Sequence, residues 1–204
     1  MRTLATSLVS LVVVLGLPHR AGAQSILAGV VAGVVESRQI RERGADSDAR
    51  TGFLAGAWAD IPTPALPLHV LAEVAYVRRG GTFPLGDPAD LLGDVEADYL
   101  ATTVAPLVRI GIGLFAAFVY AGPMFETPLR TRSAAALRTA YANPSDQGIS
   151  ATAGAGLEWL GPRWVVRGEA RIVEGLSAAF SGPAGEYRHR SVEVLLRVGR
   201  SGLR

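Results

Sequence analysis

Two groups of residues have types and spacings that could do hydrolytic or metal chemistry. His189 and Ser191 are one residue apart, a spacing at which an imidazole can act as the base for a serine nucleophile. Such a site also needs an acid that orients the imidazole, and no glutamate follows at a matching distance, since Glu193 is the last acid of the chain and lies on the strand face that we expect to point inward. A second group is acidic and could attract a divalent cation: Asp87, Asp90, Asp94, Glu96 and Asp98. Its spacing does not fit a calcium-binding loop, so a solvated acidic segment is the favoured interpretation.

A third pattern, Gly111-x-Gly113-x-x-Ala116, matches the glycine spacing of a dinucleotide-binding loop. The acidic residue expected about 20 positions later is missing, and the following stretch contains Gly122-Pro123, which opposes a helix. We interpret this pattern as a turn between strands. The chain has no cysteine, which excludes thiol nucleophiles and thiolate metal sites. We therefore expect no catalytic, cofactor-binding or metal-binding residues.

The charged residues are more informative through their alternation. Between Trp164 and Glu174, the charges of Arg167, Glu169 and Arg171 share one face of a strand, and apolar residues occupy the other face. On a helix these charges would be spread around the cylinder. Alternation of this kind, or the length and composition of a strand, recurs in eight segments: Ser25–Arg38, Thr51–Ile61, Leu68–Tyr76, Tyr99–Arg109, Gly113–Phe125, Thr152–Leu160, Trp164–Glu174 and Ser191–Gly199.

The connections between these segments alternate in length. Charged stretches follow every odd-numbered strand: Gln39–Arg50, Arg79–Asp98, Glu126–Gln147 and Gly175–Arg188. Short turns follow the second, fourth and sixth strands: Pro62–Pro67, Ile110–Ile112 and Gly161-Pro162. Long external loops and short periplasmic turns are typical of an up-and-down outer-membrane barrel.

The N-terminus has the layout of a secretory signal peptide. Arg2 precedes an apolar run from Leu4 to Leu17, and Ala21-Gly22-Ala23 forms a small-residue cleavage site. We expect residues 1–23 to be the signal peptide and residues 24–204 the barrel domain. Only 19% of the 204 residues are charged, below the roughly 25% of a soluble domain. Without Arg2 and Arg20 the formal charge of +2 becomes zero, which gives no reason to expect a nucleic-acid partner.

These patterns predict an all-β fold, an eight-stranded antiparallel up-and-down transmembrane β-barrel preceded by a signal peptide. A strand can cross hydrocarbon only within a closed sheet, because every backbone polar group must be paired. We expect the charges to face inward and to balance one another, in a lumen network of Glu73, Arg109, Glu158, Arg167, Glu169, Arg171, Glu193 and Arg197. We expect Tyr76, Trp159 and Trp164 to form an aromatic girdle at the membrane interfaces.

Several of these segments resemble the outer membrane protein β-barrel domain family, often called PorT-like, and more loosely the small eight-stranded barrels of the OmpA and OmpX type. The matching stretches are Gly52–Gly56, Leu71–Gly80, Tyr99-Leu100, Tyr120–Pro123 and Gly154–Glu158. The resemblance covers nearly all of residues 24–204. It implies a porin-like integral protein of the cell envelope, in the outer membrane of a Gram-negative-type bacterium, usually without a known reaction.

On this basis we expect a structural or surface-interaction role without an open pore, an enzyme activity or a cofactor. The expected partners are outer-membrane lipid and lipopolysaccharide, with a protein partner as an option at Gln39–Arg50 and Glu126–Gln147. Two alternative functions stay open. His189-x-Ser191 resembles an element of outer-membrane lipid A deacylases, and a soluble periplasmic lipocalin-like barrel would bind an apolar ligand inside. A helical membrane protein is a structural alternative, because Ile110–Phe125 is an uncharged run.

Overall fold

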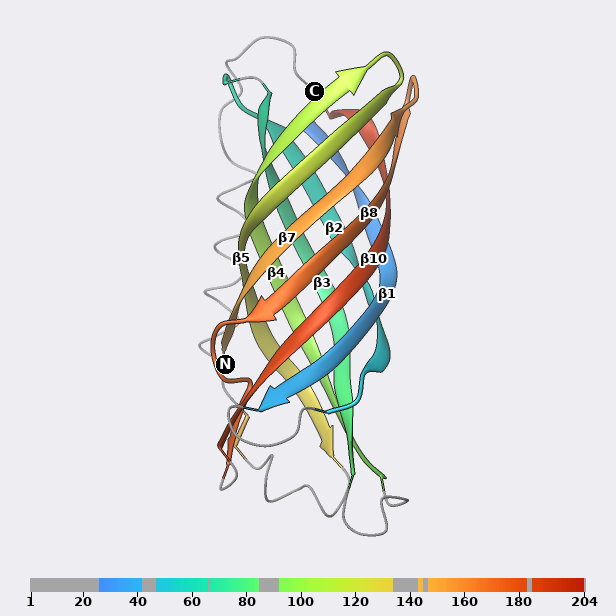
Figure 1. Ribbon diagram of the computed structural model, residues 1–204. Coiled ribbons are helices and arrows are strands. Elements are labelled where there is room, and N and C mark those ends of the chain that lie inside the picture. Colours follow the sequence, from blue (N-terminus) through green and yellow to red (C-terminus); the bar gives the residue numbers. More distant parts are fainter. Residues whose placement is uncertain are drawn as a thin grey trace.

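The computed structural model describes residues 26–41, 47–65, 67–84, 92–133, 143–144, 147–182 and 185–203. The predicted signal peptide lies outside the described residues, as do Ser25, Asp87 and Asp90. Ten strands are present in the described ranges (Figure 1). They are β1 (Ile26–Arg41), β2 (Arg50–Pro62), β3 (Leu68–Pro84), β4 (Leu92–Ile112), β5 (Phe115–Ser133), β6 (Asn143–Pro144), β7 (Gly148–Leu160), β8 (Trp164–Gly175), β9 (Phe180–Gly182) and β10 (Gly185–Leu203).

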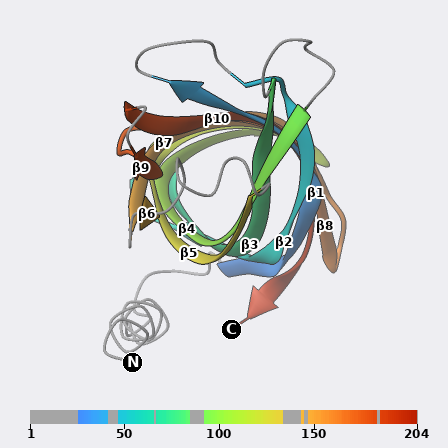
Figure 2. The ribbon, with the colours of Figure 1, turned by 90° about the horizontal axis from the view of Figure 1, so that it is seen from below.

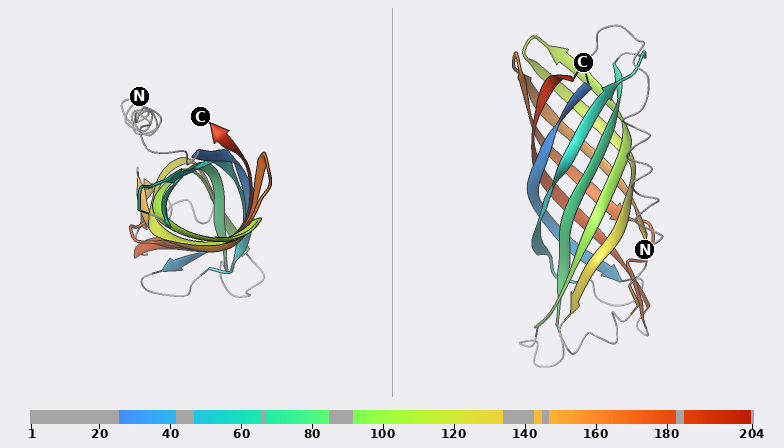
Figure 3. Two further views of the ribbon diagram at one scale, coloured as in Figure 1. Left: turned by 90° about the horizontal axis from the view of Figure 1, so that it is seen from above. Right: turned by 180° about the vertical axis from the view of Figure 1, so that it is seen from behind.

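Eight of these strands form a closed antiparallel barrel, which confirms the predicted fold class. Each barrel strand pairs with the next one along the chain, and β1 pairs with β10 from Ile26 opposite Leu203 to Arg41 opposite Tyr187. Views along the axis show the strands as a ring (Figures 2 and 3). Closure leaves no strand of the wall with an unpaired edge at mid-height, as crossing hydrocarbon requires. The two short strands β6 and β9 extend the sheet beside β10.

The two ends of the barrel differ. The turn end, uppermost in Figure 1, carries Ile26, Leu203 and three short connections, at residues 63–67, 113–114 and 161–163. The predicted turn at Ile110–Ile112 is wrong, because those residues complete β4. The actual turn is Gly113-Leu114, and Gly113 has a φ of 64°, a left-handed conformation that glycine adopts without steric cost. A two-residue hairpin of this kind needs such a residue.

The opposite end, here called the loop end, contains longer strands than the sequence predicts. β3 continues to Pro84, β4 begins at Leu92, and β5 continues to Ser133. Much of the stretches predicted as charged loops is therefore paired sheet, for example Arg78 opposite Asp98 and Glu96 opposite Arg132. Outside the bilayer both faces of a strand can be polar, so backbone pairing continues where the alternation of polarity has stopped.

The outer wall carries a belt of apolar side chains. On β10, Val192, Val194 and Leu196 are between 52% and 63% exposed, and they lie between Arg190 and Arg200. Ten residues of a strand tilted by about 40° span about 25 Å, the height of the apolar band of a transmembrane barrel. We therefore take the levels of Arg190 and Arg200 as the limits of the membrane-spanning segments. A lipocalin-type barrel has its apolar side chains facing inward, around the ligand. Here the apolar side chains of β10 face outward, so the lipocalin alternative is wrong.

Aromatic side chains lie near both limits of the belt. At the turn end, Trp159 and Trp164 are 41% and 55% exposed, and Phe115 lies opposite Trp159 on the neighbouring strand. Towards the loop end, the Tyr76 ring packs against Phe53, with 5.6 Å between ring centroids. The residues predicted for the girdle thus point outward, and sequence reasoning missed the phenylalanines beside them.

In the part of the chain that the structure describes, no helix has the length and hydrophobicity needed to cross a membrane. Residues 110–125, considered above as a membrane helix, instead belong to β4, the Gly113-Leu114 turn and β5.

Candidate functional site

The interior of the barrel is filled by charged side chains. Among the predicted lumen residues, Arg109 has a side chain that is 22% exposed. The others are at most 5% exposed: Glu73, Glu158, Glu169, Glu193, Arg167, Arg171 and Arg197. Further buried charged or titratable residues were missed: Asp60, His69, Arg79, Glu126 and His189. Counting both sets, six carboxylates face five guanidinium groups, a near balance that limits the cost of burying them.

The cluster at the turn end is organised around Arg167, which is fully buried. Its Nε donates to Glu158 at 2.5 Å, and its Nη2 donates to Asp60. His69 Nδ1 lies 2.7 Å from the second oxygen of Asp60. The Arg167 guanidinium also lies 4.5 Å from the centroid of the Trp58 ring, so cation–π attraction adds to the ion pairs. Arg109 approaches both carboxylates at about 3.5 Å from the periphery of the cluster.

The central cluster connects three strands of the wall. Arg171 donates to Glu73 at 2.8 Å and to Glu193 at 2.6 Å. Arg197 pairs with the other oxygen of Glu73 at 2.6 Å and with Glu169 at 2.7 Å. Arg197 bonds to both oxygens of Glu169, and a bidentate pair of this kind fixes geometry as well as charge.

The loop-end cluster continues the network through Glu193. Arg79 Nη2 donates to Glu193 at 2.8 Å, and its Nη1 donates to Glu126. The second oxygen of Glu126 accepts a hydrogen bond from Ser150 at 2.6 Å and lies 2.9 Å from His189 Nε2. The sequence analysis assigned Arg79 and Glu126 to loops. In the structure they lie on the longer strands β3 and β5, and their side chains are buried in the barrel interior.

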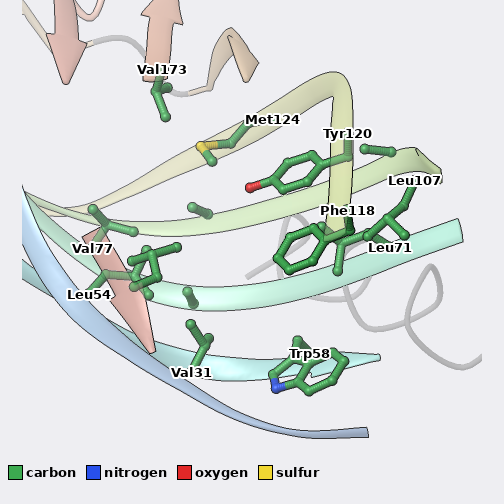
Figure 4. Close-up of a cluster of buried hydrophobic side chains, with 14 of the residues drawn as sticks. Val31, Leu54, Trp58, Leu71, Val77, Leu107, Phe118, Tyr120, Met124 and Val173 are labelled. Carbon is green, nitrogen blue, oxygen red and sulfur yellow. The ribbon is translucent and has the colours of Figure 1, made fainter. Parts of the chain in front are cut away.

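Aromatic and aliphatic side chains occupy the remaining interior space (Figure 4). Tyr120 donates to Glu169 at 2.5 Å, and its ring covers Gly154 on the neighbouring strand. A Cβ at Gly154 would lie only 2.6 Å from that ring, so glycine provides the room for it. Towards the loop end, a second group of buried hydrophobic side chains packs together: Val95, Ala97, Tyr99 and Tyr187.

The acidic residues at the loop end are ion-paired on the outer face. Arg50 contacts Asp94 at 2.6 Å and Glu96 at 2.7 Å, and Arg78 contacts Asp98 at 2.9 Å. The Thr82 hydroxyl and the Arg50 guanidinium hold the pKa of Asp94 below its usual value. In the described ranges, no group of three or more histidine or acidic residues could hold a metal ion.

The two residues considered above as a possible hydrolytic pair, His189 and Ser191, have different partners in the structure. Ser191 donates to Glu193 at 3.1 Å, whereas His189 lies 3.3 Å from Ser150. Glu126 and Ser150 both approach the same imidazole nitrogen, Nε2. A serine–histidine–acid relay needs the serine and the acid on opposite nitrogens, so this arrangement does not provide one. Gly111–Ala116 lies in the β4–β5 hairpin and does not precede a helix.

Comparisons with known proteins identify the fold. No protein-family model matches the sequence, and no curated protein matches it. The outer membrane protein OprG from Pseudomonas aeruginosa is structurally similar, with a TM-score of 0.57, 10% identity, and coverage of 88% of this chain and 96% of OprG. Neisserial surface protein A (NspA) is similar with a TM-score of 0.52, 12% identity, and coverage of 87% and 99%. The chain therefore has the fold of the small eight-stranded outer membrane β-barrels, with the ionic interior and apolar outer wall of a barrel that spans a membrane.

Proposed function

We propose that the protein is an integral barrel of the bacterial outer membrane that acts as a structural or surface-interaction protein and does not form an open pore. The observation that carries this proposal is the occupied interior. Three clusters of ion pairs follow one another along the axis, and Val95, Ala97, Tyr99 and Tyr187 pack together towards the loop end. Eight-stranded barrels are narrow enough for side chains to fill.

The loop end faces the external medium in this proposal, because both described ends of the chain lie at the turn end. Its paired arginines and acids, such as Arg50 with Asp94 and Arg78 with Asp98, present a polar rim. Just above the apolar belt, Arg38 lies directly opposite Arg190 on the outer face. Arg190 itself pairs with Glu174 at 2.5 Å, so this level of the outer face carries charges of both signs, against which the headgroups of lipid and lipopolysaccharide would lie.

We also propose that the protein is not an enzyme. Ser150 and Ser191, the serines closest to a base or an acid in the loop-end cluster, are both at most 1% exposed. Each donates its hydroxyl proton to a carboxylate that also pairs with Arg79. A hydroxyl held in this way is occupied as a donor, and the imidazole nitrogen beside Ser150, His189 Nε2, is itself engaged by Glu126 and Arg79.

Reconstitution into planar bilayers tests the absence of a pore. We expect no stable single-channel steps, because ions would have to displace buried guanidinium–carboxylate pairs such as Arg171–Glu73. Floatation of the same protein with lipid vesicles, together with the fluorescence of the exposed Trp164, shows that the barrel has inserted. Long-lived conductance steps of uniform size, obtained with inserted protein, would contradict the proposal.

A further inference from the structure

A hollow lies in the outer wall of the barrel, across the strands β5, β7, β8 and β10. Its volume is about 400 Å³, within the range of sites that hold small molecules, and it is open to the outside. Three alanines form its floor, and larger residues stand at its edges. The floor residues are Ala153, Ala155 and Ala170, and the edge residues are Val119, Ile172 and Val192.

The shape of the hollow follows from strand β7, which has short side chains where its neighbours have branched ones. Ala153 of β7 lies opposite Ile172 of β8, and Ala155 lies opposite Val119 of β5. The three edge side chains are between 52% and 60% exposed, so they project from the wall. The wall is therefore lower between them than on β10, where valine and leucine follow one another along the outer face.

The hollow lies within the apolar belt. Val192, at its edge, is two residues from Arg190 on the same face of β10, and the level of Arg190 is the loop-end limit of the membrane-spanning segments. Because the strands are tilted, the hollow crosses the wall obliquely from there towards β5. An occupant of this part of the wall comes from the hydrocarbon of the bilayer.

The lining favours an apolar occupant. All the floor and edge side chains are alanine, valine or isoleucine. Two polar residues, Tyr120 and Arg171, also line the hollow, but their side chains are buried. Tyr120 contacts Glu169 and Arg171 contacts Glu193, both in the barrel interior. The outward-facing part of the lining thus offers no polar side chain to a headgroup.

The extent of the hollow distinguishes a lipid chain from a second copy of the barrel. Nine residues line it, whereas a stable interface between two proteins involves about 20–30 residues on each side. Lipid chains are as apolar as the wall, so the closeness of packing decides which chain stays in contact. A concave surface contacts one chain on several sides, and many weak contacts add up to a measurable preference.

We propose that this hollow binds one unbranched acyl chain of a bilayer lipid, which stays in place longer than the other chains around the barrel. The inference goes beyond the proposed surface role and rests on the proposed membrane location. It implies that the protein recognises the chain and not the headgroup, because the outward-facing lining is apolar throughout.

An alanine in the floor provides a sharp variant. Ala155 is exposed, and Ala155→Leu fills the hollow with an apolar side chain. Ala57→Leu is the matched control, because Ala57 is exposed on the outer face of β2 and does not line the hollow. Strands β1, β8 and β10 separate β2 from β7 on one side of the barrel. Both substitutions keep the lipid-facing wall apolar, so the fold tolerates them.

The experiment is native mass spectrometry of the purified barrel in detergent micelles, titrated with one lipid at a time. The probes are dipalmitoylphosphatidylglycerol, dipalmitoylphosphatidylcholine and diphytanoylphosphatidylcholine, whose chains carry methyl branches. We expect one saturable lipid per barrel and similar affinities for the two dipalmitoyl lipids. The affinity should be about tenfold weaker for the branched lipid and for Ala155→Leu, and unchanged in Ala57→Leu.

Four results would overturn the proposed chain site. They are the absence of a saturable first lipid, equal affinities for straight and branched chains, equal effects of the two substitutions, and a change of oligomeric state in Ala155→Leu. The last result would assign the hollow to a second copy of the barrel. Floatation with lipid vesicles tests the membrane location separately, so a barrel that floats but retains no lipid contradicts the chain site alone.

Discussion

Replacing Arg167 by methionine is expected to lower the free energy of unfolding by about 3–5 kcal/mol, the usual cost of removing one partner from a buried ion pair. The substitution leaves Asp60 and Glu158 as buried carboxylates without their main cation. The remaining neighbours are Arg109, which is partly exposed and approaches both carboxylates, and His69, which contacts Asp60. It also removes the cation that lies over the Trp58 ring. Equilibrium unfolding in urea, from lipid vesicles, measures the loss.

Two comparisons make this result specific. Arg190→Met removes an exposed pair with Glu174 and should cost about 0–1 kcal/mol. Adding Asp60→Asn and Glu158→Gln to the Arg167→Met variant should recover much of the loss, because the two buried negative charges disappear with their partner. Similar effects of Arg167→Met and Arg190→Met would show that Arg167 is not enclosed in the barrel.

Placing arginine at position 194 is expected to destabilise the barrel by about 2–4 kcal/mol, the cost of a basic side chain on the lipid face near the bilayer midplane. Val194 is 63% exposed and lies between the levels of Arg190 and Arg200. The guanidinium would have to extend to an interface or draw water into the hydrocarbon region. The same unfolding measurement in vesicles detects this change.

Leu129→Arg is the matched control for position 194. Leu129 is 55% exposed on β5 and lies beyond the belt, next to Arg130. Arginine there should cost about 0–1 kcal/mol, as found near the interfaces of such barrels. Equal losses of unfolding free energy at positions 129 and 194 would show that the height assigned to the apolar belt is wrong. No loss at position 194 would show that this side chain does not face lipid.

The strands that cross the belt could be predicted from the sequence because the bilayer imposes a strict pattern on them. Between Trp164 and Glu174, every charged residue before the last has to face inward, and the spacing of Arg167, Glu169 and Arg171 shows this directly. The fold class follows, because several such strands are stable in hydrocarbon only as a closed sheet.

The loop-end cluster could not be predicted in the same way. Beyond the belt, polar residues are tolerated on both faces of a strand. The segments that begin at Arg79 and Glu126 therefore have the composition of loops, although both residues lie on paired strands. Contacts between residues on different strands also cannot be predicted from the spacing of residues along one strand. His189 was paired with Ser191 from its sequence neighbourhood, whereas the folded chain brings it to Ser150 and Glu126.

Trp58 shows a further limit. A tryptophan on a strand of a transmembrane barrel is readily assigned to the interface, as Trp159 and Trp164 were, yet Trp58 is 3% exposed and lies inside. Its indole N–H donates to the carbonyl of Val30 at 3.0 Å, and its ring covers Gly199 across the closed wall. That space depends on how the first and last strands pair, which is a property of the complete barrel.

The three tryptophans provide the most direct test of the central claim, that ionic groups face the axis and apolar groups face lipid. In three single-tryptophan versions, made by replacing the other two with phenylalanine, quenching by lipids brominated near the headgroup end of the acyl chain reports contact with lipid. We expect strong quenching of Trp159 and Trp164 and little quenching of Trp58, which packs against Arg167 and Arg197 inside the wall. Quenching of Trp58 as strong as that of Trp164 would contradict the account.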